Sequence, residues 1–354
     1  MNTTKLYKPD ETGYLSQEGT KSYYSRIGFF AFFLGAISLL VAIITSLVLQ
    51  IWFPWMLENS LIYLIINCSV TVLSIYCIAM PVALLLIKPL PKIRPIKEKL
   101  NPLHFIFAIC VSFFFLDVGQ SISQITLELS QKITGEMPSD PFLMSTSTPE
   151  LIINAAFTCL VAPILEEILF RRLLCNRLLP LGEKKAIVIS AAIFGLIHGN
   201  FYQFAYAFLI GLVFGYIYVK TGRVIYTIII HGIINFFGST LIELISRKLP
   251  TEEFIEQLFP NGQITLEAVE AAQEQLMPYM EGLTMFTFYV LVNAALVIAG
   301  GIIFFVLTLK RKINFEQGIL QTPREHRFSN FFLTGGVAAA IGYFVVSFLL
   351  SIVP

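Results

Sequence analysis

The sequence predicts an all-α membrane protein, a polytopic bundle of about nine transmembrane helices with polar residues in its interior. Two observations support this prediction. The 354 residues are 56% hydrophobic and only 13% charged, with a mean hydropathy of +0.76, whereas a soluble domain carries about 25% charged residues. Apolar runs also recur along the chain at lengths near the roughly 20 residues that a spanning helix needs.

Nine apolar segments are candidates for these helices. The third carries Asp117, Gln120 and Gln124 in its second half, but it keeps one apolar stripe at helical spacing. The fifth is short for a span that faces lipid, so we expect other helices to surround it. In chain order the predicted segments are Ile27–Phe53, Leu61–Ile87, Leu103–Leu129, Leu151–Leu179, Ala186–Gly199, Phe204–Val219, Val224–Ile245, Leu283–Leu309 and Phe331–Val353.

The basic residues predict the orientation of these segments. If all nine span and the N-terminus is cytoplasmic, 21 of the 24 Lys and Arg residues fall in cytoplasmic segments, as the positive-inside rule requires. The C-terminus is then extracytoplasmic. The net charge of +1 provides no global basic field, so we expect the lipid bilayer as a partner and no nucleic acid.

Four regions follow from this topology. Residues 1–149 hold the cytoplasmic N-terminus and the first helices, and residues 150–246 hold the polar groups that could perform chemistry. Residues 247–282 form an extracytoplasmic acidic insert, which we interpret as a solvated helical hairpin, with a lid or substrate-gripping element as the alternative. Thr251 followed by two glutamates predicts a helix start there. Residues 283–354 complete the bundle.

The five cysteines predict no covalent or metal framework. They are odd in number and widely spaced within apolar segments, which matches neither a disulfide pattern nor a zinc-binding spacing. We therefore interpret them as small hydrophobic residues.

Two adjacent acids stand in the fourth apolar segment. On a helix the side chains of Glu166 and Glu167 diverge by about 100°, which predicts different roles. Glu167 precedes Arg171 by four residues, the favourable order for a helical ion pair. Glu166 has no local cation, and an unpaired carboxylate in an apolar setting suits a general base for water. The alternative, a helix that simply ends near Arg172, is disfavoured because apolar residues continue to Leu174.

Two histidines and an amide follow at similar predicted depths. His198 ends the fifth segment, while His231 and Asn235 lie one turn apart on the seventh. An isolated histidine in an apolar helix is more often a packing residue than a catalyst, but two of them near a buried pair of acids reverse that expectation. His231 and Asn235 could donate hydrogen bonds to the oxyanion of a tetrahedral intermediate. Ionisable groups inside a membrane are functional candidates by default.

These motifs resemble a known family. The sequence contains EExxxR at Glu166–Arg171, FxxxH at Phe194–His198 and HxxxN at His231–Asn235, with a glycine-containing run from Gly211 to Gly222 between the last two. The ordered set is similar to that of the CPBP family of intramembrane proteases, which includes type II CAAX prenyl endopeptidases and bacterial Abi proteins. The resemblance covers about residues 150 to 245, and it implies an integral protein of a bacterial cell membrane.

The resemblance also implies residue roles. Glu166 would activate water with help from His198, His231 and Asn235 would hold the oxyanion, and Glu167, Arg171 and Phe194 would shape the site. The implied substrate is a membrane-associated peptide or protein. Ala207, Gly211 and Gly215 form a small-residue face that predicts close helix packing.

Metal dependence and activity remain open at this stage. Glu166, His198 and His231 could bind a divalent metal such as zinc, but HExxH, which puts two ligands on one turn, is absent. We therefore favour a glutamate-dependent site without a cofactor. The alternative functions are a non-proteolytic immunity or signalling protein of the bacteriocin self-immunity type, which would bind a partner, and a transporter with a proton relay. No two-half repeat supports the transporter.

Overall fold

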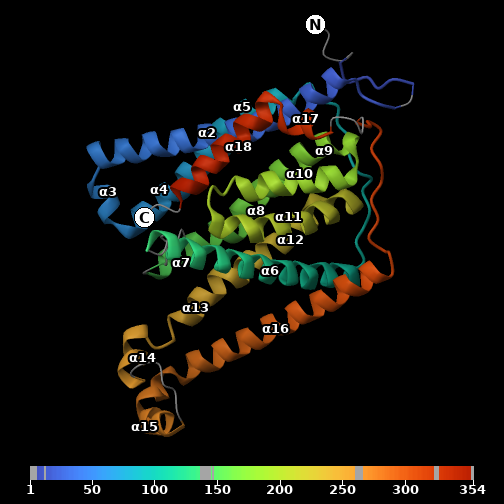
Figure 1. Cartoon of the computed structure of the whole chain (residues 1–354). Helices are drawn as coiled ribbons and strands as arrows, with labels where there is room; N and C mark the ends of the chain where they lie inside the picture. The colour runs from blue at the N-terminus through green and yellow to red at the C-terminus, as the bar shows by residue number, and fades with distance from the viewer. Residues whose placement is uncertain are drawn as a thin grey trace.

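The structure, a computed structural model, describes residues 6–11, 13–135, 145, 147–259, 266–322 and 327–351. Within these ranges every regular element is a helix, and pairing between extended segments is limited to two isolated β-bridges. Figure 1 shows the helices stacked in layers, with the N-terminus at one end and α13 to α15 at the opposite corner. The predicted all-α fold is confirmed.

Within the described residues, seven helical stretches are long and apolar enough to cross a membrane. Two further predicted segments are shorter helices of 14 and 16 residues, α10 (Glu183–Leu196) and α18 (Gly335–Leu350). The end of the predicted segment at Val353 lies outside the described residues. Three of the seven are single helices: α2 (Gln17–Trp52), α6 (Pro102–Thr134) and α11 (Phe201–Thr221). The other four are the stretches Ser60–Ile87, Thr148–Leu181, Val224–Ser246 and Ala272–Leu309. The stretch Ser60–Ile87 begins with α4 (Ser60–Thr71) and ends with α5 (Met80–Ile87), and Ala272–Leu309 contains α16 (Met280–Leu309).

The N-terminus and four connections lie at one end of the bundle. The backbone amide of Glu98 donates to the carbonyl of Thr221, and that of Leu320 donates to Pro180, both at 2.8 Å. Extended chain after α5 and after α16 therefore lies across the turns that flank α10 and α11. Figure 1 shows these two extended segments running along the same edge of the molecule. This is the end predicted to be cytoplasmic.

The remaining connections meet at the opposite end. Arg247 donates to the carbonyls of Ser145 at 2.8 Å and Ser147 at 3.2 Å. The hydroxyl of Ser347 on α18 donates to the carbonyl of Gly199 at 3.1 Å. Connections thus alternate between the two ends, as they would if α10 and α18 each carried the chain across.

The predicted small-residue face of α11 packs closely on α10. A Cβ atom at Gly211 would lie 3.1 Å from the Cβ of Ala191, and one at Gly215 would lie 3.1 Å from a methyl group of Ile187. Ala207 on the same face is buried. α10 also packs on residues Ile168–Cys175, so most of its residues are buried, as predicted from its shortness, while Val188 is exposed.

π-helical turns interrupt the spans that carry the polar motifs. Each such turn holds an extra residue, and π-turns are frequent at functional sites. The span Thr148–Leu181 consists of α7 (Thr148–Ala156), a π-turn η2 (Phe157–Val161), α8 (Ala162–Glu167), a second π-turn η3 (Ile168–Cys175), α9 (Asn176–Leu178) and a 3₁₀ turn (Leu179–Leu181). The span Val224–Ser246 consists of α12 (Val224–Asn235), π-turn η5 (Phe236–Leu241) and α13 (Ile242–Ser246), and a further π-turn η1 (Val72–Ala79) joins α4 to α5.

The acidic insert contains two short helices, α14 (Glu252–Leu258) and α15 (Leu266–Leu276). The side chain of Thr251 accepts a hydrogen bond from the amide of Phe254, as predicted for the cap of the first helix. Figure 1 shows both helices beyond α13, at the end opposite the N-terminus. Residues 260–265 between them lie outside the described part of the chain.

Cysteine labelling in intact cells will test the predicted orientation. Lys97 in the extended segment after α5 and Gln273 on α15 are exposed, and Figure 1 shows that segment and α15 in different parts of the bundle. The exposed Cys77 can be replaced with Ser to lower the background. We expect Gln273→Cys to react with an impermeant polar thiol reagent added outside and Lys97→Cys to react only after permeabilisation. The reverse pattern would invert the topology.

Candidate active site

The polar groups predicted from the motifs come together from three helical spans. Glu166 and Glu167 end α8, where η3 begins, and His231 and Asn235 lie on α12. His198 follows the end of α10 by two residues. The helices α8 and α12 pack against each other, which places the acids opposite the imidazole of His231.

A buried ion pair forms part of this cluster. The Nε atom of Arg171 is 3.0 Å from Oε2 of Glu167, and both side chains are 0% exposed. The Nη1 atom donates to the hydroxyl of Ser190 at 3.4 Å. The guanidinium also lies over the rings of Phe194 and Phe214, at 5.3 and 5.9 Å from their centroids. Aromatic faces stabilise a desolvated cation, so this pair is held on several sides.

The imidazole of His231 lies between the two carboxylates. Its Nδ1 atom is 3.3 Å from Oε1 of Glu167, and its Nε2 atom is 3.7 Å from Oε2 of Glu166. Because Glu167 is already held by Arg171, we assign the Nδ1 proton to the bond with Glu167. Nε2 then faces Glu166. A carboxylate bound to one nitrogen fixes the ring orientation and determines what the other nitrogen presents.

The two glutamates differ in their access to solvent. The side chain of Glu166 is 19% exposed, whereas that of Glu167 is 0% exposed. Glu166 therefore has open surface beside it, and Glu167 has none. Since water in a membrane must arrive through a cavity lined by protein, the neighbouring acids are suited to different tasks: Glu166 can meet a reactant, and Glu167 can only position other groups.

His198 and Asn235 each make a hydrogen bond to backbone. The Nδ1 atom of His198 is 2.8 Å from the carbonyl oxygen of Phe194, one turn earlier, which leaves Nε2 to face away from its own helix. Glu166 interacts electrostatically with His198 as well as with His231. The amide nitrogen of Asn235 donates to the carbonyl of Thr158 in η2 at 2.8 Å, a bond that the spacing of His231 and Asn235 did not predict.

Sequence reasoning missed two side chains around the acids. Tyr76, in η1 of the second span, is buried and close enough to Glu166 and Glu167 to interact electrostatically with both. Ser190 on α10 contacts Arg171. In the sequence, the only indication of a role for these residues was that each is a hydroxyl side chain among apolar residues. No local spacing connected either residue to the acids.

Metal ligation would depend on the ring nitrogens of the two histidines that other groups leave open. Among the described residues, no three His, Cys, Asp or Glu side chains are gathered so that they could hold a metal ion. Both ring nitrogens of His231 already face carboxylates, and Nδ1 of His198 faces a backbone carbonyl. The Nδ1 atoms are therefore engaged, while Nε2 of His231 lies 3.7 Å from Glu166, too far for a hydrogen bond. Glu166, His198 and His231 stay the candidate ligands if a metal binds.

Comparison with known proteins confirms the resemblance. Residues 148–237 match the family model described as type II CAAX prenyl endopeptidase Rce1-like, and this range contains all the motif residues from Glu166 to Asn235. The chain is also 30% identical over 87 residues to the UPF0177 protein YxdF of Lactococcus lactis subsp. lactis (strain IL1403), which is 24% of this chain and 48% of that protein. The chain thus spans about half the length of this curated relative. No solved structure matches the chain.

The different environments of Glu166 and Glu167 predict that replacing them has different effects on thermal stability. Glu167→Gln leaves the buried guanidinium of Arg171 without its counter-charge, which costs about 3–5 kcal/mol. We expect a clear fall in thermal stability of the detergent-purified variant. Glu166→Gln, at the partly exposed neighbour, is the matched control and should melt close to the wild type. Equal melting temperatures for the two variants would contradict the division.

Proposed function

We propose that this protein is an intramembrane endopeptidase that hydrolyses a membrane-associated peptide or protein with Glu166 as the general base. The observation that carries the proposal is a partly exposed glutamate facing an imidazole whose other nitrogen is held by the buried Glu167–Arg171 pair. The match to an endopeptidase family over the same residues supports it.

In the proposed reaction, Glu166 takes a proton from a bound water while the water oxygen attacks the carbonyl carbon of the scissile amide. His198, which lies within electrostatic range of Glu166, helps to orient the water through Nε2. The tetrahedral intermediate then collapses with cleavage of the C–N bond, and Glu166 returns the proton to the leaving nitrogen.

His231 and Asn235 supply the proposed oxyanion donors. The Asn235 amide has a second N–H beyond the one bound to Thr158. His231 can donate from Nε2 when that nitrogen carries a proton, and Nε2 lies 3.7 Å from Glu166. Donors fixed in place in a water-poor site stabilise developing charge without reorganisation. Tyr76 lies near the same carboxylates, and its hydroxyl offers a third donor.

Replacement of the base tests the assignment. Glu166→Gln keeps the shape of the side chain but removes its basicity, so cleavage of a quenched membrane peptide should fall by at least about 100-fold, the lower range for loss of a general base. Glu128→Gln, at an exposed position on α6, is the control and should retain activity. Full turnover by folded Glu166→Gln would refute the assignment. Inactivity of the wild type on all peptides would favour the non-proteolytic alternative.

Metal content separates the proposed glutamate-dependent mechanism from a metal-dependent one. We expect elemental analysis of purified, active protein to give well under one equivalent of zinc or another transition metal, and we expect treatment with a chelator to leave the cleavage rate unchanged. Stoichiometric metal that disappears together with activity, and restoration of both on readdition, would instead assign Glu166, His198 and His231 as ligands.

A further inference from the structure

The turn η2 presents two backbone carbonyl groups to α12, the helix that carries His231 and Asn235. The side-chain amide of Asn235 donates to the carbonyl of Thr158 at 2.8 Å. Three residues earlier on α12, a Cβ atom at Gly232 would lie 2.7 Å from the carbonyl oxygen of Cys159. That distance is inside van der Waals contact, so only a glycine allows this approach. The two backbones therefore meet at two points beside the proposed oxyanion donors.

Pro163 explains why the carbonyl of Thr158 is free to accept a bond from Asn235. In an α-helix this carbonyl would accept from the amide of residue 162, and with π-helical spacing it would accept from that of residue 163. The amide of Ala162 donates instead to the carbonyl of Phe157, and residue 163 is a proline, which has no N–H. A backbone carbonyl inside a membrane needs a donor, and Asn235 provides it from the neighbouring helix.

We propose that Pro163 and Gly232 are positioning residues that hold Asn235 in place for catalysis. Pro163 leaves the carbonyl of Thr158 to the Asn235 amide, and Gly232 lets α12 come close enough for that bond. Because an amide group is planar, fixing one N–H also fixes the direction of the other, which is the proposed oxyanion donor. This role rests on the proposed function, and neither residue needs to touch the substrate.

Replacement of Pro163 with Ala separates positioning from stability. Alanine restores an N–H that can donate to the carbonyl of Thr158, so the Asn235 amide loses its fixed orientation. We expect kcat for a quenched membrane peptide to fall by about 10- to 100-fold with KM little changed, because an oxyanion donor acts in the transition state. We expect the melting temperature in detergent to stay the same or rise, since a proline inside a helical span is unfavourable. A purely structural role for Pro163 would lower both.

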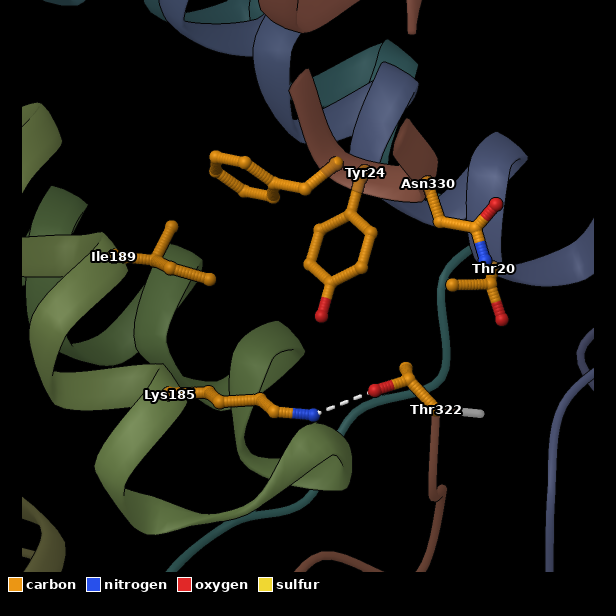
Figure 2. A pocket seen from close by; sticks show the side chains of 7 residues that line it. Thr20, Tyr24, Lys185, Ile189, Thr322 and Asn330 are labelled. Carbon is orange, nitrogen blue, oxygen red and sulfur yellow. Dashed lines mark hydrogen bonds between the residues drawn. The ribbon is translucent and has the colours of Figure 1, made fainter. Parts of the chain in front are cut away.

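Two variants serve as controls. Pro149→Ala makes the same replacement on the same span, but in the exposed first turn of α7, where a helix leaves its N–H groups unpaired. Lys185→Met removes the 2.8 Å bond from the Lys185 ammonium to the hydroxyl of Thr322, which Figure 2 shows in a cavity whose described lining includes none of the motif residues. Both variants should keep the wild-type kcat, even if Lys185→Met lowers the melting temperature.

Gly232→Ala tests the second point of contact, and it also covers the case in which Pro163→Ala does not fold. The added methyl group must push α12 away from the carbonyl of Cys159, so kcat should fall while KM stays near the wild-type value. In the Asn235→Ala background the same replacement should lower kcat much less, because the group that it positions is gone. Gly238→Ala, on the same span with no described atom within 4 Å of the added Cβ, is the matched control and should keep kcat. Equal kcat for the two alanine variants would overturn the proposal.

A double-mutant cycle on thermal stability tests the contact without relying on activity. Asn235→Ala leaves the carbonyl of Thr158 without a donor, so it should lower the melting temperature of the wild type. In the Pro163→Ala background the restored N–H takes that carbonyl, so the same replacement should cost clearly less. This coupling without cleavage by any variant would support the contact and refute the proposed function. An equal cost in both backgrounds, or wild-type kcat for Pro163→Ala in an active enzyme, would overturn the positioning role and leave the proposed function standing.

Discussion

The buried ion pair between Glu167 and Arg171 is the interaction on which the candidate site depends. Removing two charges from water is costly, and their attraction compensates only when the geometry is good and the remaining donors are satisfied. Here two aromatic rings cover the guanidinium and Ser190 accepts from Nη1, while Nη2 is buried without a hydrogen-bond partner in the described structure. The second oxygen of Glu167 then holds the imidazole of His231. One local pair therefore joins α10, α11 and α12 to the span that contains it.

The surrounding helices keep this pair at its depth. Close packing of α11 on α10 through Gly211 and Gly215 brings α10 into the interior, where Ser190 and Phe194 meet Arg171. The π-turns on either side of α8 shift the helical register by the extra residue that such turns contain. Asn235 bonds to one of them through the carbonyl of Thr158, so the turn and the polar side chain position each other.

The sequence was most informative where interactions are local. The four-residue spacing of Glu167 and Arg171 predicted their pair, and apolar run length predicted the spans, because both depend on helix geometry alone. The position of His231 between two acids depends on how helices 64 residues apart in the chain pack together. The same holds for Tyr76, which comes from a span outside the motifs. The π-turns have no residue pattern that distinguishes them from ordinary helix, so they too were not predictable.

The two carboxylates on either side of His231 determine what a proton transfer costs in this site. In the proposed mechanism Arg171 is positive, Glu167 is negative, and Glu166 and His231 share one proton, so the four groups sum to zero charge whichever of the two holds that proton. A change in total charge is expensive where the dielectric constant is low. A transfer between Glu166 and His231 leaves the total unchanged and only reorients a dipole. The arrangement therefore lets a proton change places inside a membrane without creating an isolated ion.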